Sequence, residues 1–157
     1  MPAAGTHFGL IDESWCPTVS QKVRHEYDRM LEVLHKRAPH ARILAVGCPA
    51  VVPQDASSCN YGDLTPFGTV TPGDLDWLRE DVLEPLNRAI DSSTNAQGAA
   101  GVVDLYDSSR NHSVCGNSEW VEGFVALPDQ LSFVHPNALG HRNAADHVEE
   151  AMLNAIS

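Results

Sequence analysis

The sequence predicts an α/β fold with parallel strands, because segments with a helical spacing of apolar residues alternate with short aliphatic runs. The order along the chain is helix, strand, helix, strand, helix. The chain has 157 residues, of which 43% are hydrophobic and 20% are charged. This length and composition are typical of a single globular domain, which we place over 1–157.

The first helix is predicted over 18–38, where apolar residues recur with helical spacing. Thr18 is its candidate N-cap, and Pro39 ends it. A strand follows over 42–46, an unbroken aliphatic run of the kind that parallel sheets bury on both faces. The next stretch, 47–71, is irregular, and loops of this length are usually functional or braced.

Thr71 and Pro72 begin the second helix, with a hydroxyl as N-cap and a proline in the first turn. Pro85 is expected to kink this helix. The second strand is predicted over 101–106, and Pro136 opens the last helix. The inward-facing residues of that helix are predicted to be Ala144, Ala145, Val148, Met152 and Ile156.

Two parallel strands do not make a viable sheet, because parallel sheets are covered on both faces and normally have more members. We therefore expect the domain to be incomplete, with its first strands N-terminal to Met1 and missing from the chain. The other solution is pairing of the open edge with a second copy, which predicts a homodimer or poor solubility.

The net charge of −11, from 21 acidic and 10 basic residues, disfavours nucleic acid and anionic membrane surfaces as partners. No apolar run approaches the roughly 20 residues of a membrane-spanning helix. The first residues have neither the basic nor the apolar region of a signal peptide, so an export signal is expected upstream if the protein is secreted.

The four cysteines contain no C-x-x-C pair of the kind that binds zinc. Cys48 closely follows the aliphatic run of the first strand and is interpreted as a buried free thiol. Cys59 and Cys115 lie in polar, loop-like stretches, where a bridge is compatible with an oxidising compartment. Cys16 has no evident partner.

His135 carries the strongest functional signal, because it directly precedes the proline that opens the last helix. This junction lies beyond a strand end, where α/β folds gather their sites, and imidazole suits general-base catalysis near neutral pH. A lone histidine of this kind more often caps a helix or packs on the surface. The residues around His135 favour catalysis.

The motif His-Pro-Asn-x-x-Gly-His, over 135–141 and followed by an alanine-rich helix, resembles the final block of SGNH (GDSL-type) hydrolases. Secreted actinobacterial esterases and lipases are the most similar members. Other matching segments, in the order of that family, are Arg37-Ala-Pro-His-Ala41, Val46-Gly-Cys-Pro49, Val103-Asp-Leu105, and His112-x-x-Cys115 with Trp120. The resemblance implies a three-layer α/β/α, flavodoxin-like sandwich, a Cys59–Cys115 disulfide, and His135 as the catalytic base.

Several expected parts of this family have no match in the chain. The Gly-Asp-Ser block with the nucleophile and the blocks with the oxyanion-hole glycine and asparagine are absent. The aspartate that usually stands three residues before the histidine is Ser132 here, and Asp129 is a second candidate partner for His135. Ser108 and Ser109 follow a strand but are interpreted as part of a polar loop, and Asp104 as a structural residue.

The resemblance implies hydrolysis of a small-molecule or lipid ester through an acyl-enzyme, with no cofactor and no metal, by a secreted protein. The spacing of six between His135, His141 and His147 puts them on different helical faces, which also argues against a metal site. The serine nucleophile is expected upstream of this chain. The alternative is a catalytically inactive, truncated remnant of the family that binds a partner or serves only as a fold.

Overall fold

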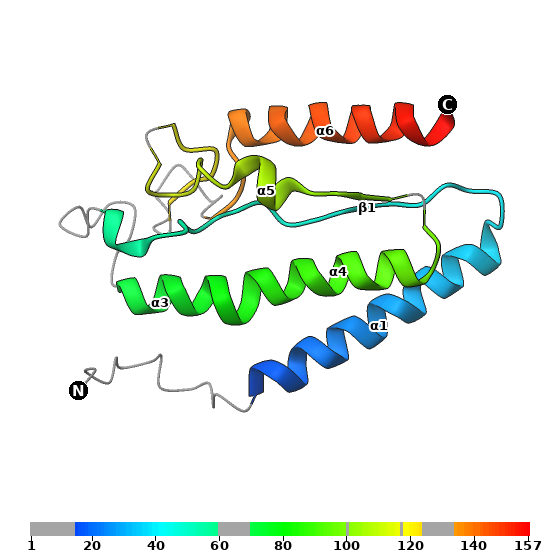
Figure 1. The fold of residues 1–157 in the computed structure, drawn as a ribbon, viewed down its shortest axis with the longest axis horizontal. Coiled ribbons are helices and arrows are strands. Elements are labelled where there is room, and N and C mark those ends of the chain that lie inside the picture. The colour runs from blue at the N-terminus through cyan, green and yellow to red at the C-terminus, as the bar shows by residue number, and fades with distance from the viewer. Residues whose placement is uncertain (1–14, 60–69, 100, 117, 124–133) are drawn as a thin grey trace, which may run out of the picture.

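The computed structural model describes residues 15–59, 70–99, 101–116, 118–123 and 134–157. Two parallel strands, β1 (Leu44–Val46) and β2 (Gly101–Val103), pair along their whole length. Helix α6 (Ala138–Ile156) covers one face of this pair and α4 (Glu84–Ala96) covers the other, as Figure 1 shows. Parallel strands between two layers of helices confirm the predicted α/β fold.

Helix α1 (Trp15–Arg37) packs against α4 and ends before Pro39, as predicted. Its start was predicted wrongly, because Thr18 lies inside the helix and Trp15 begins it. Pro17 is compatible with this earlier start, since the amide nitrogens of the first turn have no helical acceptor and a proline loses nothing there.

Thr71 caps α3 (Pro72–Trp77), and it forms a reciprocal capping box with Asp74. The helix then widens into the π-helical turn η2 (Leu78–Leu83) before it continues as α4. The kink that was predicted at Pro85 is therefore observed as a π-helical turn that precedes this proline. Proline has no N–H for the carbonyl one turn earlier, and the wider turn accommodates that loss.

Both strands are shorter than predicted. β1 begins at Leu44, and Val46 is 45% exposed, so the prediction of a strand buried on both faces is wrong. β2 ends at Val103, because the Asp104 side chain caps the short helix α5 (Leu105–Ser109). The last helix begins two residues after Pro136, with Asn137 as its N-cap.

The main hydrophobic core lies beyond the carboxyl ends of the strands. It is gathered from the loop after β1, which contains the single 3₁₀ turn η1 (Ala56–Ser58), from α3 and η2, from α5, and from the loop that follows α5. Its largest fully buried members are Val52, Leu75, Val114 and Val121. The loops at this end are therefore part of the packed interior.

The face of α6 that was predicted to point inward is largely exposed. Met152 is 56% and Ile156 is 75% exposed, and α6 has no buried residue. The prediction fails because only two strands lie beneath this 19-residue helix in the described part of the chain. Helix α1 also exposes large apolar side chains, namely Val23, Met30, Val33 and Leu34. None of the described helices is long and apolar enough to cross a membrane.

We propose that a second copy covers the outer edge of β1, which among the described residues pairs with β2 alone. The expected result is a mass of about twice 17.0 kDa by light scattering. A Val46→Lys variant should return the protein to a monomer, because a charged side chain on an edge strand opposes pairing. A stable, soluble wild-type monomer would contradict the proposal.

Candidate active site

His135 lies three residues before the start of α6. The N-terminal end of α6 lies at the end of the molecule where both strands end (Figure 1). The first turns of α6 are joined to α5, the helix that follows β2, through a hydrogen bond of 2.9 Å from Asn143 Nδ2 to Ser108 Oγ. His135 itself is exposed. The predicted location, a loop-to-helix junction beyond the strand ends, is therefore the observed one.

A short antiparallel ladder holds the backbone of His135. The Glu122 amide donates to the His135 carbonyl oxygen at 2.8 Å, and the Asn137 amide donates to the Trp120 carbonyl oxygen at 2.9 Å. Between these two bonds, Val121 and Pro136 form the bridge pair. The ladder thus fixes the main chain on both sides of the imidazole.

Val134 enters this ladder with a positive φ of 60°. Its amide donates to the Gly123 carbonyl oxygen at 3.1 Å. A β-branched residue in the left-handed region is strained, at a cost of about 1–3 kcal/mol. Such strain persists only where surrounding contacts enforce it, which is typical of functional sites.

Asn137 secures the start of α6 with both atoms of its amide group. Its Oδ1 accepts hydrogen bonds from the amides of Leu139 and Gly140 at 2.9 and 3.2 Å. Its Nδ2 donates to the carbonyl oxygen of Glu119 at 2.7 Å. The asparagine of the sequence motif is therefore an N-cap that also ties the helix to the ladder.

Gly140 lets the helix approach the ladder closely. A Cβ at this position would overlap the carbonyl oxygen of Trp120 and would lie 3.0 Å from Pro136 Cβ. The glycine of the motif is therefore required by packing, and its φ is not in the left-handed region.

Trp120 is in turn held by His112. The two rings are stacked, with centroids 3.6 Å apart and planes 6° apart. The Trp120 amide donates to the His112 carbonyl oxygen at 2.8 Å, and His112 Nδ1 lies 2.8 Å from the carbonyl oxygen of Ser118. The "His-x-x-Cys … Trp" motif thus braces the segment that carries Glu122.

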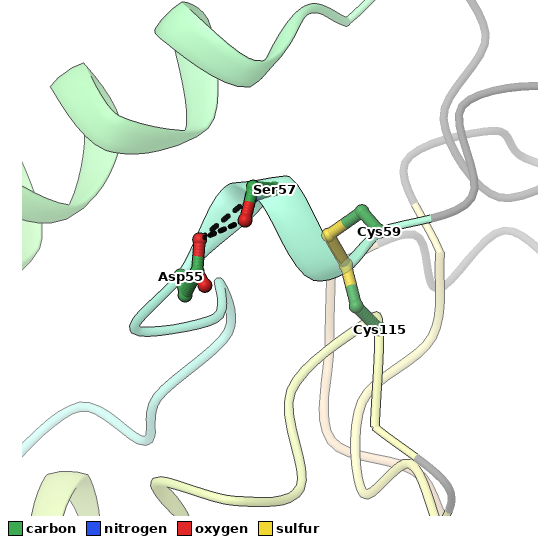
Figure 2. The surroundings of a disulfide bond; sticks show 4 residues. All are labelled: Asp55, Ser57, Cys59 and Cys115. Carbon is green, nitrogen blue, oxygen red and sulfur yellow. Dashed lines mark hydrogen bonds between the residues drawn. A yellow bond between two sulfur atoms is a disulfide. The ribbon is translucent and has the colours of Figure 1, made fainter.

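The disulfide between Cys59 and Cys115 joins the loop after β1 to the loop that contains His112 (Figure 2). Next to it, Asp55 caps η1 by accepting bonds from the hydroxyl and amide of Ser57, and these bonds lower the pKa of the Asp55 carboxyl group. The predicted pairing is confirmed. Cys48 is the free cysteine among residues with described side chains, and partial burial raises the pKa of its thiol.

Ser109 does not lie in a polar loop, as was predicted, but is buried on α5. Its hydroxyl donates to the Leu105 carbonyl oxygen at 2.6 Å and accepts from the Ala50 amide at 2.8 Å. It therefore fixes α5 to the loop after β1 and is poorly placed to act as a nucleophile. Asp104 caps α5 through the Asp107 amide, in agreement with a structural role.

Two predicted partners of His135, Ser132 and Asp129, lie outside the described residues. Within the described part of the chain, no group of three or more histidine, cysteine, aspartate or glutamate side chains could hold a metal ion.

A separate cleft of about 440 Å³ lies beside α4 and the end of β2 and does not include His135. It is lined by residues of both charges, among them Glu84, Arg88 and Arg110. Tyr106 in this cleft donates to Glu84 Oε1 and accepts from Gln54 Nε2, both at 2.9 Å. Partial burial, followed by the bond to Glu84, raises the pKa of the tyrosine.

Residues 6–142 match the model of the GDSL-like lipase/acylhydrolase family. Lipase 2 of Streptomyces coelicolor is 33% identical over 118 residues, which are 74% of this chain and 38% of that protein. An esterase of Streptomyces scabiei is 28% identical over 170 aligned positions, which cover 96% of this chain and 49% of the esterase. The chain thus spans half or less of the length of these relatives.

The fold is also similar to a solved structure, that of an extracellular lipase from Streptomyces rimosus. The TM-score is 0.63 at 19% identity, and the match covers 91% of this chain and 60% of the lipase. This likeness supports the three-layer α/β architecture.

Proposed function

Because this chain belongs to the GDSL-like lipase and acylhydrolase family, we propose that it is part of a carboxylic-ester hydrolase with His135 as general base. The observation that carries this proposal is the position of His135. Its exposed ring stands beyond the ends of parallel strands, on a backbone that the ladder and the capped start of α6 hold in place.

In the proposed mechanism, the His135 imidazole removes the proton from a serine hydroxyl as the serine oxygen attacks the ester carbonyl carbon. The tetrahedral intermediate then collapses, the bond to the alcohol breaks, and the imidazolium returns its proton to the leaving alcohol. Water next attacks the acyl-enzyme with the same base, which releases the acid and regenerates the serine.

The proposed substrate is a small-molecule or lipid ester, since the two relatives are named as a lipase and an esterase. We also propose secretion. The Cys59–Cys115 bond is of the kind that persists in oxidising compartments, and the structurally similar lipase is described as extracellular.

The second candidate is a chain that has lost catalysis and keeps the fold. The engagement of Ser108 and Ser109 favours it, because both hydroxyls are used in structural hydrogen bonds. Acyl transfer also depends strongly on oxyanion donors, and we assign none in this chain.

The test is the turnover of p-nitrophenyl acetate by the wild type, His135→Ala and His141→Ala. Exposed imidazoles cleave activated esters without any active site, and the exposed His141 controls for that background. If a serine nucleophile is available to His135 in this chain, His135→Ala alone should reduce the rate to the background, by at least about 100-fold for a lost general base. Equal rates in all three proteins would favour the inactive candidate for this chain.

A fluorophosphonate probe identifies the nucleophile directly. Labelling of one serine that depends on His135 supports an active dyad within the chain. Absence of labelling, together with equal ester turnover, would contradict catalysis by these 157 residues alone.

A further inference from the structure

The ladder that holds His135 also determines which side chain stands beside it. Because Val121 pairs with Pro136, the next residues outward, Glu122 and His135, lie opposite each other. The hydrogen bond of 2.8 Å from the Glu122 amide to the His135 carbonyl oxygen agrees with this register.

Directly opposite residues of an antiparallel pair project from the same face, with Cβ atoms about 4.5–5.5 Å apart. Burial identifies that face. Val121 is 2% exposed and points into the core, whereas Glu122 is partly exposed and His135 is exposed, so both point outward. In that regular geometry, a glutamate carboxylate on the same face as an imidazole needs only a favourable rotamer to reach the ring.

From this register we infer that Glu122 is the acidic positioning residue of His135, in the role for which Ser132 supplies no charge. The inference rests on the proposed function of His135 as general base. The Glu122 carboxylate would orient the imidazole and stabilise the imidazolium that forms when the serine proton is transferred. Neutralising the acid of the Ser-His-Asp triad is known to cost about 10⁴ in turnover, which sets the upper limit for this role.

A second carboxyl group lies near Glu122. Glu119 lies on the same segment, and partial burial together with the negative charge of Glu122 raises the pKa of the Glu119 carboxyl group. Along α6, the titratable or charged residues that follow His135 most closely in the sequence are His141 and Arg142.

The experiment follows the ring signals of His135 by NMR over a pH titration, with the signals assigned by their loss in His135→Ala. In Glu122→Gln, we expect the titration midpoint to fall by about 0.5–1 pH unit, because a nearby carboxylate favours the imidazolium. Glu119→Gln is the matched control and should leave the midpoint in place. The difference between the variants should shrink in 1 M salt, where the Debye length is about 3 Å.

If Glu122 had only a structural role, Glu122→Gln would not lower the His135 midpoint in a salt-dependent way. The variant Glu122→Asp tests the electrostatic role further. The shorter carboxylate keeps the charge, so it should retain part of the wild-type midpoint. An unchanged midpoint in Glu122→Gln, or equal changes in Glu119→Gln and Glu122→Gln, would overturn the inference.

The activity arm separates this inference from the proposed function. If the chain hydrolyses esters through His135, Glu122→Gln should lower kcat at least tenfold with little change in KM. If the wild type shows no His135-dependent turnover, the proposed function fails for this chain, while the titration still decides whether Glu122 faces His135.

Discussion

Replacing Gly140 with alanine is expected to lower the free energy of unfolding by about 2–3 kcal/mol, near the upper end for overpacking. The reason is geometric, because a Cβ would overlap the Trp120 carbonyl oxygen and press on Pro136. The backbone of Trp120 cannot move aside easily, since its amide and carbonyl are both hydrogen-bonded and its ring is stacked on His112. Urea unfolding followed by circular dichroism measures the loss.

Gly73 offers a matched control for this substitution. It also lies in the first turn of a helix, but a Cβ there would meet nothing closer than Thr71 Oγ1 at 3.8 Å. Gly73→Ala is therefore expected to raise stability by about 0.5–1 kcal/mol, because alanine loses less conformational entropy in a helix. Equal effects of the two substitutions would mean that the contact between α6 and Trp120 is not tight.

Removal of the disulfide is expected to have the largest effect on stability. Cys59 and Cys115 close a loop with a sequence separation of 56 residues, for which the chain-entropy model gives about 4 kcal/mol. Domains of this size are stable by only about 5–15 kcal/mol, so the double variant Cys59→Ala/Cys115→Ala should be marginally folded. Urea unfolding of this variant, compared with the oxidised wild type, measures the difference.

Cys48→Ala is the control for the disulfide variant, since Cys48 is a free, half-buried thiol whose loss removes little volume. Its unfolding midpoint should stay close to that of the wild type. If a reducing agent leaves the wild-type midpoint unchanged, the bond contributes nothing to stability and the prediction fails.

The fold class could be predicted because it depends on local patterns. The helices were recognisable from the spacing of their apolar residues, and Thr71 and Pro39 marked a start and an end correctly. The boundaries were harder, because competing local interactions decide them. Asp104 illustrates this, since its side chain caps α5 and so ends β2 earlier than the aliphatic pattern suggested.

Burial on α6 could not be predicted from its periodicity. The pattern indicates which residues share a helical face, but it does not say how much sheet lies beneath that face. Met152 and Ile156 share the expected face and are nevertheless exposed, because exposure depends on partners that the helix itself does not encode.

The candidate site was predicted in part. The location of His135 follows from its place before Pro136 and an N-cap, and the structure agrees with it. The contacts that hold it could not be predicted, because they join residues that are distant in sequence. The close approach of Gly140 to Trp120 depends on the loop that folds back onto the start of α6. The same is true of the position of Glu122 across from His135.

The stack of His112 on Trp120 has a practical consequence for experiments. An indole in face-to-face contact with an imidazole senses any change in that ring through its emission, and Trp120 lies in the segment that carries Glu122. With Trp15 and Trp77 replaced by phenylalanine, Trp120 becomes the only tryptophan of the chain. Its fluorescence then reports, without any attached dye, when ligands or substitutions disturb the loop beside His135.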